Sequence, residues 1–198
     1  MSVTHLPKWD VTAIEIALDL EKPRSFDQSR FVFSGRGEPR ICLVAGFALT
    51  SQLKRIVAAV DRVAPARAPS RLRIAPAVAR SAVPSFAATV SVQPMLALLR
   101  LQSKLIRAIE PGLAHEGVSL RTRPAMDDGA ARFIGDFISQ KTLPTFEPPC
   151  GVAGFDVTEL TAVGITIYRL GQRGTPSSIL CHWAFRPDSD SIHLRGGP

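Results

Sequence analysis

A strict alternation of large apolar side chains with small or acidic ones near the N-terminus is the feature that most limits how this chain folds. In residues 12–20, Ile14 and Ile16 fall on one face of an extended chain, and Glu15 and Asp19 fall on the other. A period of two residues is that of a β-strand with one face in a core, because successive side chains of a strand point to opposite sides. The segment is therefore predicted to be a half-buried strand of a sheet.

The next segments predict a central strand followed by a helix. Residues 40–47 form a short apolar run, which is typical of a strand buried on both faces. Thr50 or Ser51 is predicted to cap a helix, since their hydroxyls accept hydrogen bonds from free backbone N–H groups. Apolar side chains then recur at helical spacing until Pro65 ends the helix.

A second helix is predicted to begin at Pro94 and to stop at the Pro-Gly pair 111–112. Arg100, Lys104 and Arg107 recur along it at steps of four and three residues, so they share one face. This basic stripe predicts a solvated helix face. It lacks the interleaved aromatic side chains on which nucleic-acid bases stack.

The middle of the chain is predicted to add short strands and a long loop. Strands are expected at residues 72–75 and 86–92, and again at 133–143. Residues 112–131 are predicted to be a loop, with Asp127-Asp128 forming a turn rather than a pair of metal ligands. Together with the strands that follow, this order predicts an α+β fold with mostly antiparallel pairing.

The C-terminal part predicts two paired strands. Residues 155–169 are expected to be extended, with Gly164 as a candidate bulge, and residues 171–177 to form a hairpin turn. A closing strand is predicted at residues 178–185. In that strand His182 is expected to face away from an apolar set formed by Ile179, Cys181, Trp183 and Phe185.

Composition narrows the classes of function. The net charge of +7 over 198 residues favours anionic partners such as nucleotides, RNA or phosphate esters, although a solvated arginine-rich surface gives the same total. No apolar run is long enough to span a bilayer and no signal-peptide pattern is seen, so a cytoplasmic location is expected. Cys42, Cys150 and Cys181 have no metal-ligand spacing and are expected to be buried free thiols, with no metal or cofactor.

Two stretches of the chain resemble a known motif. They are Glu38-Pro39-Arg40-Ile41-Cys42-Leu43 and Ile138-Ser139-Gln140-Lys141-Thr142-Leu143. With the helix and hairpin described above, their order resembles the two-histidine phosphoesterase superfamily, which includes the LigT-like 2′-5′ RNA ligases and cyclic phosphodiesterases. The resemblance implies two pseudo-symmetric lobes of antiparallel sheet, with helices outside, around a central cleft. It implies one domain over residues 1–185, with a polar tail at 186–198.

Both histidines of the family's His-x-Thr/Ser motif are replaced in this chain. Arg40 stands where the first histidine is expected, and Cys42 where its hydroxyl residue is expected. Gln140 replaces the second histidine, and Thr142 alone keeps its chemical type. In the family one imidazole takes a proton from the attacking group and the other gives a proton to the leaving group. Arginine stays protonated and glutamine does not titrate, so this pair cannot cycle a proton.

The sequence leaves several functions open. The leading hypothesis is a domain that has lost the two-histidine reaction and binds a nucleotide or RNA phosphate through Arg40, Gln140 and Thr142. The cleft is alternatively vestigial, with Arg40 paired to a nearby carboxylate. A third hypothesis is an active phosphodiesterase with relocated acid and base, for which His115 and His182 are the candidates. A fourth is a non-enzymatic interaction domain that uses the basic surface. A nucleophilic Cys42 is less favoured than a buried thiol, because no histidine base is seen beside it in the sequence.

Overall fold

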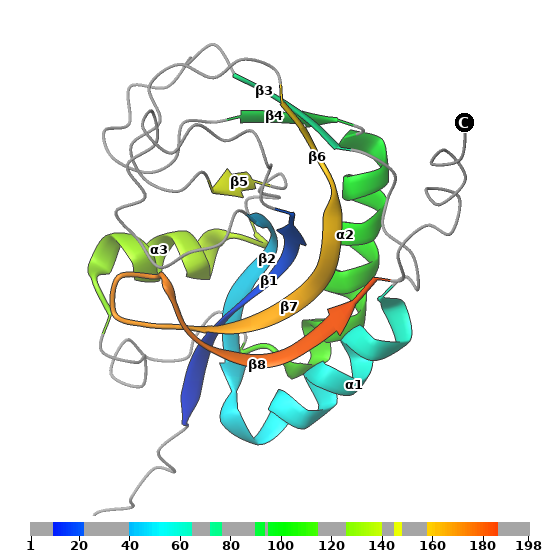
Figure 1. The fold of residues 1–198 in the computed structure, drawn as a ribbon. Coiled ribbons are helices and arrows are strands. Elements are labelled where there is room, and N and C mark those ends of the chain that lie inside the picture. The colour runs from blue at the N-terminus through cyan, green and yellow to red at the C-terminus, as the bar shows by residue number, and fades with distance from the viewer. Residues whose placement is uncertain are drawn as a thin grey trace, which may run out of the picture.

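The fold was taken from a computed structural model of the chain (Figure 1). The structure describes residues 10–21, 40–64, 72–76, 90–93, 95–114, 126–139, 145–147 and 158–185. These residues form two antiparallel sheets with helices packed outside them. The predicted α+β class with antiparallel pairing is therefore confirmed.

The larger sheet has five strands, and β1 lies at its centre. Its order is β5-β2-β1-β7-β8, and each neighbouring pair is antiparallel. Every residue of β1 is buried, because strands flank it on both sides and helices cover its faces. The strands are β1 (Val11–Leu20), β2 (Arg40–Leu49), β5 (Thr145–Glu147), β7 (Ala162–Leu170) and β8 (Pro176–Ala184).

The smaller sheet has three strands in the order β4-β3-β6, also antiparallel. Its strands are β3 (Leu72–Pro76), β4 (Val90–Gln93) and β6 (Thr158–Leu160). The strand expected at 72–75 is confirmed. The strand expected at 86–92 begins at Val90 and ends one residue later than predicted, and residues 86–89 lie outside the described part of the chain.

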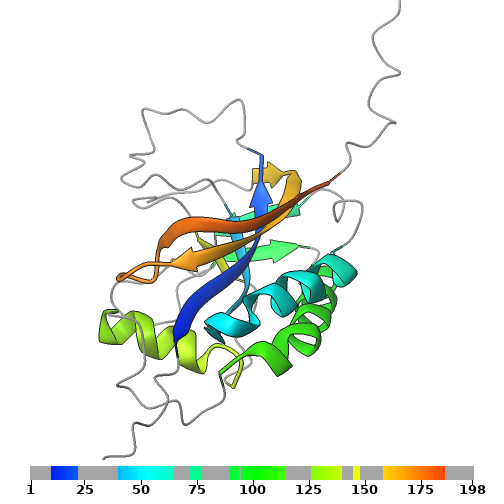
Figure 2. The same cartoon turned by 90° about the horizontal axis from the view of Figure 1, so that it is seen from below.

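Two helices cover one face of the larger sheet. They are α1 (Leu53–Val63) and α2 (Met95–Ile109), with short 3-10 turns η1 (Thr50–Gln52) before α1 and η2 (Glu110–Gly112) after α2. Figure 2 shows α1 and α2 side by side. None of the described helices is long and apolar enough to cross a membrane.

The predicted hydroxyl cap of α1 is not formed. The N-cap position of α1 is Gln52, and its side chain makes no capping bond. The Thr50 hydroxyl instead pairs with the hydroxyl of Thr12 on β1, at 2.9 Å between the oxygens. The hydroxyl therefore joins the start of β1 to the end of β2, which ties the helix entry to the sheet.

A third helix, α3 (Asp128–Asp136), covers part of the opposite face. The prediction of a loop is wrong for residues 128–131 and the prediction of a strand is wrong for residues 133–136, whereas residues 115–125 and 140–143 lie outside the described part of the chain. Ala130, Ala131 and Ile134 form a buried stripe at helical spacing, and Ala131 and Ile134 belong to the same core cluster as Phe47 of β2. The stripe is short and has a glycine near each end, which is why the sequence pattern reads as loop.

The acidic pair Asp127-Asp128, predicted to be a turn, forms the N-terminal end of α3. Asp127 is the N-cap residue and Asp128 lies in the first turn, where a negative charge interacts favourably with the helix dipole. The backbone N–H of Asp127 donates to the carbonyl of Gln172 at 2.8 Å. This bond ties the start of α3 to the turn between β7 and β8.

A β-bulge in β2 is stabilised by a buried glutamine of α2. Ile16 pairs with Val44 but Ala17 pairs with Cys42, so Leu43 is an extra residue that interrupts the ladder. The side-chain amide of Gln102 donates to the Leu43 carbonyl at 2.9 Å. A polar side chain on the buried face of α2 is thus explained by a backbone acceptor of the bulge.

Replacing Gln102 by methionine is expected to lower the free energy of unfolding by about 1–2 kcal/mol, because the Leu43 carbonyl loses a buried donor while the volume is kept. Urea denaturation measures this difference. Ser103→Ala, at an exposed neighbouring position on α2, should change stability by no more than about 0.5 kcal/mol. Equal stability of the two variants would contradict the role of Gln102.

β8 contains two extra residues relative to β7. Leu170 pairs with Pro176 but Arg169 pairs with Ser178, and Tyr168 pairs with Ile179 but Ile167 pairs with Cys181. Ser177 and Leu180 are therefore bulge residues. The predicted apolar face of the closing strand is wrong at Ile179, which lies on the other face from Cys181 and is 63% exposed. The prediction that His182 faces away from Cys181 and Trp183 is confirmed.

The cysteines partly follow the prediction. Cys42 is a buried free thiol. Cys181 is also a free thiol, but it is only partly buried, because β8 packs less deeply than β2. Cys150 lies outside the described residues, as does the tail at 186–198.

Candidate functional site

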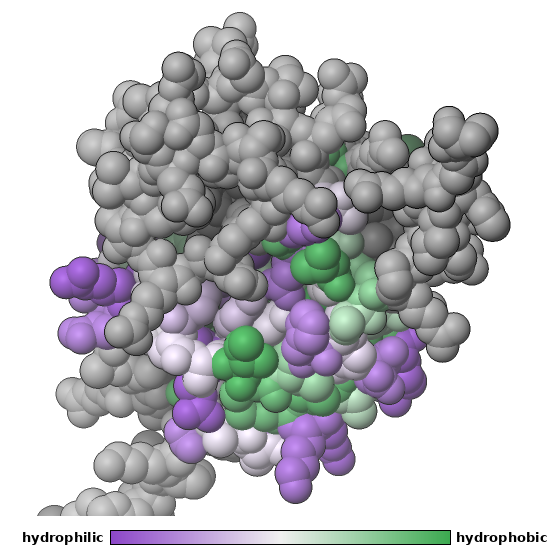
Figure 3. All heavy atoms as spheres, viewed as in Figure 1, coloured by the Kyte–Doolittle hydropathy of each residue, from purple (hydrophilic) through white to green (hydrophobic). Residues whose placement is uncertain are grey.

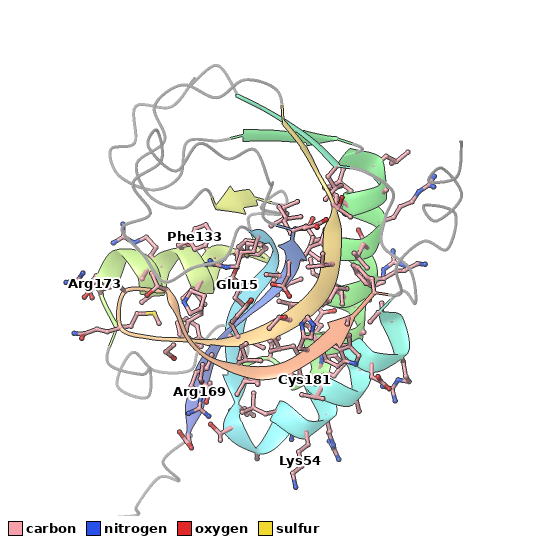
Figure 4. The ribbon with its side chains drawn as sticks, viewed as in Figure 1. Glu15, Lys54, Phe133, Arg169, Arg173 and Cys181 are labelled. Atoms are coloured by element: carbon pink, nitrogen blue, oxygen red, sulfur yellow. The ribbon has the colours of Figure 1, made fainter. Side chains whose placement is uncertain are left out.

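One face of the larger sheet carries a group of polar side chains, which we call the polar face. Alternation along β1 directs Glu15 and Asp19 to this face, while Ile14 and Ile16 enter the core under α1 and α2. α3 packs on the same face farther along the strands. Figure 4 shows Glu15 on the α3 side of the sheet. The polar face consists of Glu15 and Asp19 of β1, Arg40 of β2, Thr166 and Tyr168 of β7, and His182 of β8.

Cross-strand pairing brings these residues together from distant parts of the sequence. Arg40 and Gly164 lie opposite Asp19 on its two sides. Thr166 lies opposite His182, and Glu15 lies opposite Tyr168. Side chains that are opposite or diagonal on adjacent strands are within reach of one another, so the sheet register itself assembles the site.

Arg40 forms a buried ion pair with Glu15. Its Nε donates to Glu15 Oε1 at 3.0 Å, and its Nη2 donates to Oε2 at 3.3 Å. Both residues are almost fully buried, with Arg40 7% and Glu15 2% exposed. The guanidinium carbon also lies 5.8 Å from the centre of the Tyr168 ring, within the range of a cation–π contact. A two-point bond of this kind fixes the orientation of the guanidinium.

Asp19 accepts hydrogen bonds from two hydroxyls of β7. Thr166 Oγ1 donates to Asp19 Oδ2 in a short bond, and Tyr168 Oη donates to Oδ1 at 2.8 Å. Asp19 is 5% exposed and Thr166 is 1% exposed. The two donors satisfy one oxygen each, so hydrogen bonds compensate the burial of this carboxylate.

His182 completes the cluster from the neighbouring strand. Its Nδ1 lies 2.7 Å from Thr166 Oγ1 and 3.4 Å from Asp19 Oδ2. Its side chain is 45% exposed, so the imidazole has one edge against the cluster and another toward solvent. Gly164 makes room for the ring, because a Cβ at that position would lie 2.6 Å from His182 Cε1.

Burial, together with the hydrogen bond to Asp19 and the charge of that carboxylate, raises the pKa of Tyr168 well above its ordinary value of about 10. The phenol keeps its proton in the folded protein where an unfolded chain has lost it. Stability from this group is therefore full below about pH 10 and falls as the pH rises above it.

Alkaline titration of the folded protein should reveal this shift directly. Tyr168 is the one tyrosine of the chain, so the ultraviolet absorbance of tyrosinate reports it alone. We expect a midpoint above that of the protein unfolded in urea, and an Asp19→Asn variant should move the midpoint down. Equal midpoints in folded and unfolded protein would contradict the raised pKa.

The structure places part of the predicted site. Arg40 and Cys42 both point to the side of the polar face, as the motif spacing predicts. Cys42 is 1% exposed, which disfavours a role as a nucleophile. Gln140, Thr142 and His115 lie outside the described residues, so their roles stay predictions. Among the described residues no group of three or more histidine, cysteine or acidic side chains is arranged to hold a metal ion.

Four residues of the polar face were not singled out from the sequence as site residues. These are Glu15, Asp19, Thr166 and Tyr168. The alternation of β1 already separates Glu15 and Asp19 from the apolar face, and two acidic residues on one face of a central strand are a signal that buried partners exist. Nothing in the spacing along the chain links them to Thr166, because the contact depends on the pairing of β1 with β7.

The exposed surface around β8 combines apolar and charged side chains. Ile179 is 63% exposed and Val163 is 38% exposed. Figure 3 shows hydrophobic and hydrophilic patches interspersed over this part of the molecule. The stripe of Arg100, Lys104 and Arg107 is exposed on α2, as predicted for a solvated helix face.

No family model matches the chain, and no curated protein matches it. Among solved structures, the chain is similar to LigT of E. coli in its apo form. That similarity covers 90% of this chain and 99% of the LigT chain, with a TM-score of 0.47 and 14% sequence identity.

Proposed function

We propose that this chain is a domain of the two-histidine phosphoesterase type that binds the phosphate of a nucleotide or an RNA end without the family's two-histidine reaction. The observation that carries the proposal is Arg40. It is a permanently charged side chain, buried on the polar face, at the position where the resemblance expects a histidine that transfers protons. A guanidinium there binds an anion but takes no proton from a substrate.

The pairing of Arg40 with Glu15 sets the condition for such binding. A phosphate that approaches the guanidinium competes with the Glu15 carboxylate for the same donors, since both anions bind them in the same forked geometry. Gln140 and Thr142 are proposed as the neutral donors that complete the site. The net charge of +7 favours the approach of an anion over the longer range.

Phosphorus NMR of the protein mixed with a 2′,3′-cyclic nucleotide tests the proposal. We expect the ligand line to shift or broaden, because the phosphate is bound, and no phosphate monoester line to appear. A monoester line that grows with time would show that the two-step proton transfer survives in other groups. An unchanged ligand line would show that no phosphate site exists for this ligand.

Glu15→Gln is expected to increase the affinity for the nucleotide, because it removes the carboxylate that competes for Arg40. The change in Kd is measured by titration at fixed ionic strength. The matched control is the double variant Glu15→Gln/Arg40→Gln, which leaves no charge in the pair. It should bind no nucleotide, and equal affinity of the single and double variants would exclude Arg40 as the anchor.

A further inference from the structure

The bonds of the polar face determine which nitrogen of His182 carries a proton. Thr166 has one hydroxyl hydrogen, and that hydrogen is donated to Asp19 Oδ2. The same oxygen lies 2.7 Å from His182 Nδ1, so in this contact Thr166 accepts and Nδ1–H donates. In a neutral imidazole with the proton on Nδ1, Nε2 has a free lone pair. The cluster therefore prepares Nε2 to accept a proton.

A carboxylate also faces the nitrogen of the ring that carries the proton. Asp19 Oδ2 lies 3.4 Å from Nδ1, and Asp19 is buried, so its charge is little screened by solvent. Among the residues whose side chains the structure describes, the other charged groups on this face are Glu15 and Arg40, which form an ion pair. Tyr168 donates its proton to Asp19 and has a raised pKa, so it holds that proton and does not act as an acid.

We propose that His182 Nε2 is a general base for ribonucleoside 3′-phosphodiesters whose leaving group departs as a stable anion, with Thr166 and Asp19 as positioning residues. The proposal rests on the proposed phosphate site and names the substrate class that the site would act on. It requires one proton acceptor, whereas the family's reaction requires an acceptor and a donor. It therefore predicts activity only toward substrates that bring their own nucleophile and a leaving group that needs no proton.

Nε2 takes the proton of the substrate's 2′-hydroxyl, and the 2′-oxygen forms a bond to phosphorus. The bond between phosphorus and the leaving oxygen breaks, and the leaving group departs with its electron pair as a stable anion. The products are a 2′,3′-cyclic phosphate, the anion and an imidazolium that returns its proton to solvent. Hydrolysis of the cyclic phosphate is not expected, because its leaving alkoxide needs a proton donor.

Uridine 3′-(4-nitrophenyl phosphate) tests this step, since its cleavage releases the coloured 4-nitrophenolate. We expect release by the unmodified protein and a loss of about 100-fold or more in the His182→Gln variant, as for removal of a general base. Lys54→Gln, at an exposed position of α1, is the control and should keep full activity. Activity that survives in His182→Gln would overturn the proposal.

Nitrogen NMR of the imidazole gives a second readout that does not depend on turnover. We expect the neutral ring of His182 to carry its proton on Nδ1, and the Thr166→Val variant to lose that preference because the acceptor is gone. A neutral ring with its proton on Nε2 in the unmodified protein would overturn the proposal that Thr166 and Asp19 set the tautomer of His182. Rescue of the preference in Thr166→Ser would support the hydroxyl as its cause.

The two assays separate the failure of this inference from the failure of the proposed function. If the cyclic nucleotide binds but the aryl ester is not cleaved, the phosphate site stands and His182 is not a base. If the nucleotide does not bind and the ester is not cleaved, both proposals are overturned. If the ester is cleaved, and cleavage is lost in His182→Gln but kept in Lys54→Gln, the role of His182 as a general base is supported whatever the affinity for the cyclic nucleotide.

Discussion

Replacing Arg40 by methionine is expected to lower the free energy of unfolding by about 3–5 kcal/mol, the largest effect of any single substitution considered for this chain. Glu15 is 2% exposed, and without the guanidinium its carboxylate is left in the protein interior next to the buried Asp19. A buried charge without its partner is far more costly than the pair, because neither water nor the partner compensates its lost hydration. Urea denaturation at neutral pH measures the loss.

The double variant Glu15→Leu/Arg40→Met distinguishes loss of the ion pair from loss of packing. Removing both charges should restore most of the stability, since apolar residues of similar size often replace a buried pair at little cost. Arg169→Met is the control for loss of an arginine as such, because Arg169 is exposed on β7 and labelled at the outer surface in Figure 4. If the double variant were as unstable as Arg40→Met, the pair would not explain the effect.

Gly164→Ala is expected to cost about 2–3 kcal/mol and to displace His182 from the polar face. The added Cβ would lie 2.6 Å from His182 Cε1 and 2.7 Å from the backbone oxygen of Trp183, and the backbone cannot move away without opening the β7–β8 pair. Thermal unfolding measures the stability, and nitrogen NMR measures whether the His182 ring keeps its bond to Thr166.

Gly129→Ala is the matched control for Gly164→Ala. Gly129 lies in α3, and a Cβ there meets nothing within 4 Å. Alanine in a helix is favoured over glycine by about 0.5–1 kcal/mol, so this variant should be at least as stable as the parent. A Gly164→Ala protein as stable as Gly129→Ala would show that the ring and the strand can rearrange freely.

The parts of the fold that the sequence predicts are those with a long, regular period. The alternation of β1 and the apolar stripes of α1 and α2 are strong, and each of these elements was expected near its observed place. α3 was missed because its stripe is short and its glycines resemble those of a loop. The face of β8 was partly wrong because a bulge does not change the composition of a strand.

The candidate site was only partly predictable for a related reason. Arg40 and Cys42 could be placed because they follow one another along a single strand, where spacing fixes the face. Asp19 and Thr166 come from strands far apart in the sequence, and their contact depends on the register between β1 and β7. His182 was a candidate only as a relocated histidine, since its partners could not be known before the sheet order.

The two bulges of β8 determine which of its residues lie opposite which residues of β7. Counted from the turn, the extra residue Ser177 moves the pairing with β7 by one position and the extra residue Leu180 moves it by a second, so Thr166 lies opposite His182. If the strand paired without the second shift, His182 would lie opposite Ile165 and its imidazole would enter the apolar layer. Deleting Leu180 would keep His182 opposite Thr166. Adding one residue between the turn and His182 without a new bulge would end that pairing. The face on which the histidine lies is thus set by the number of paired residues between the turn and His182, so a change in length within this strand has a different consequence from a change in sequence.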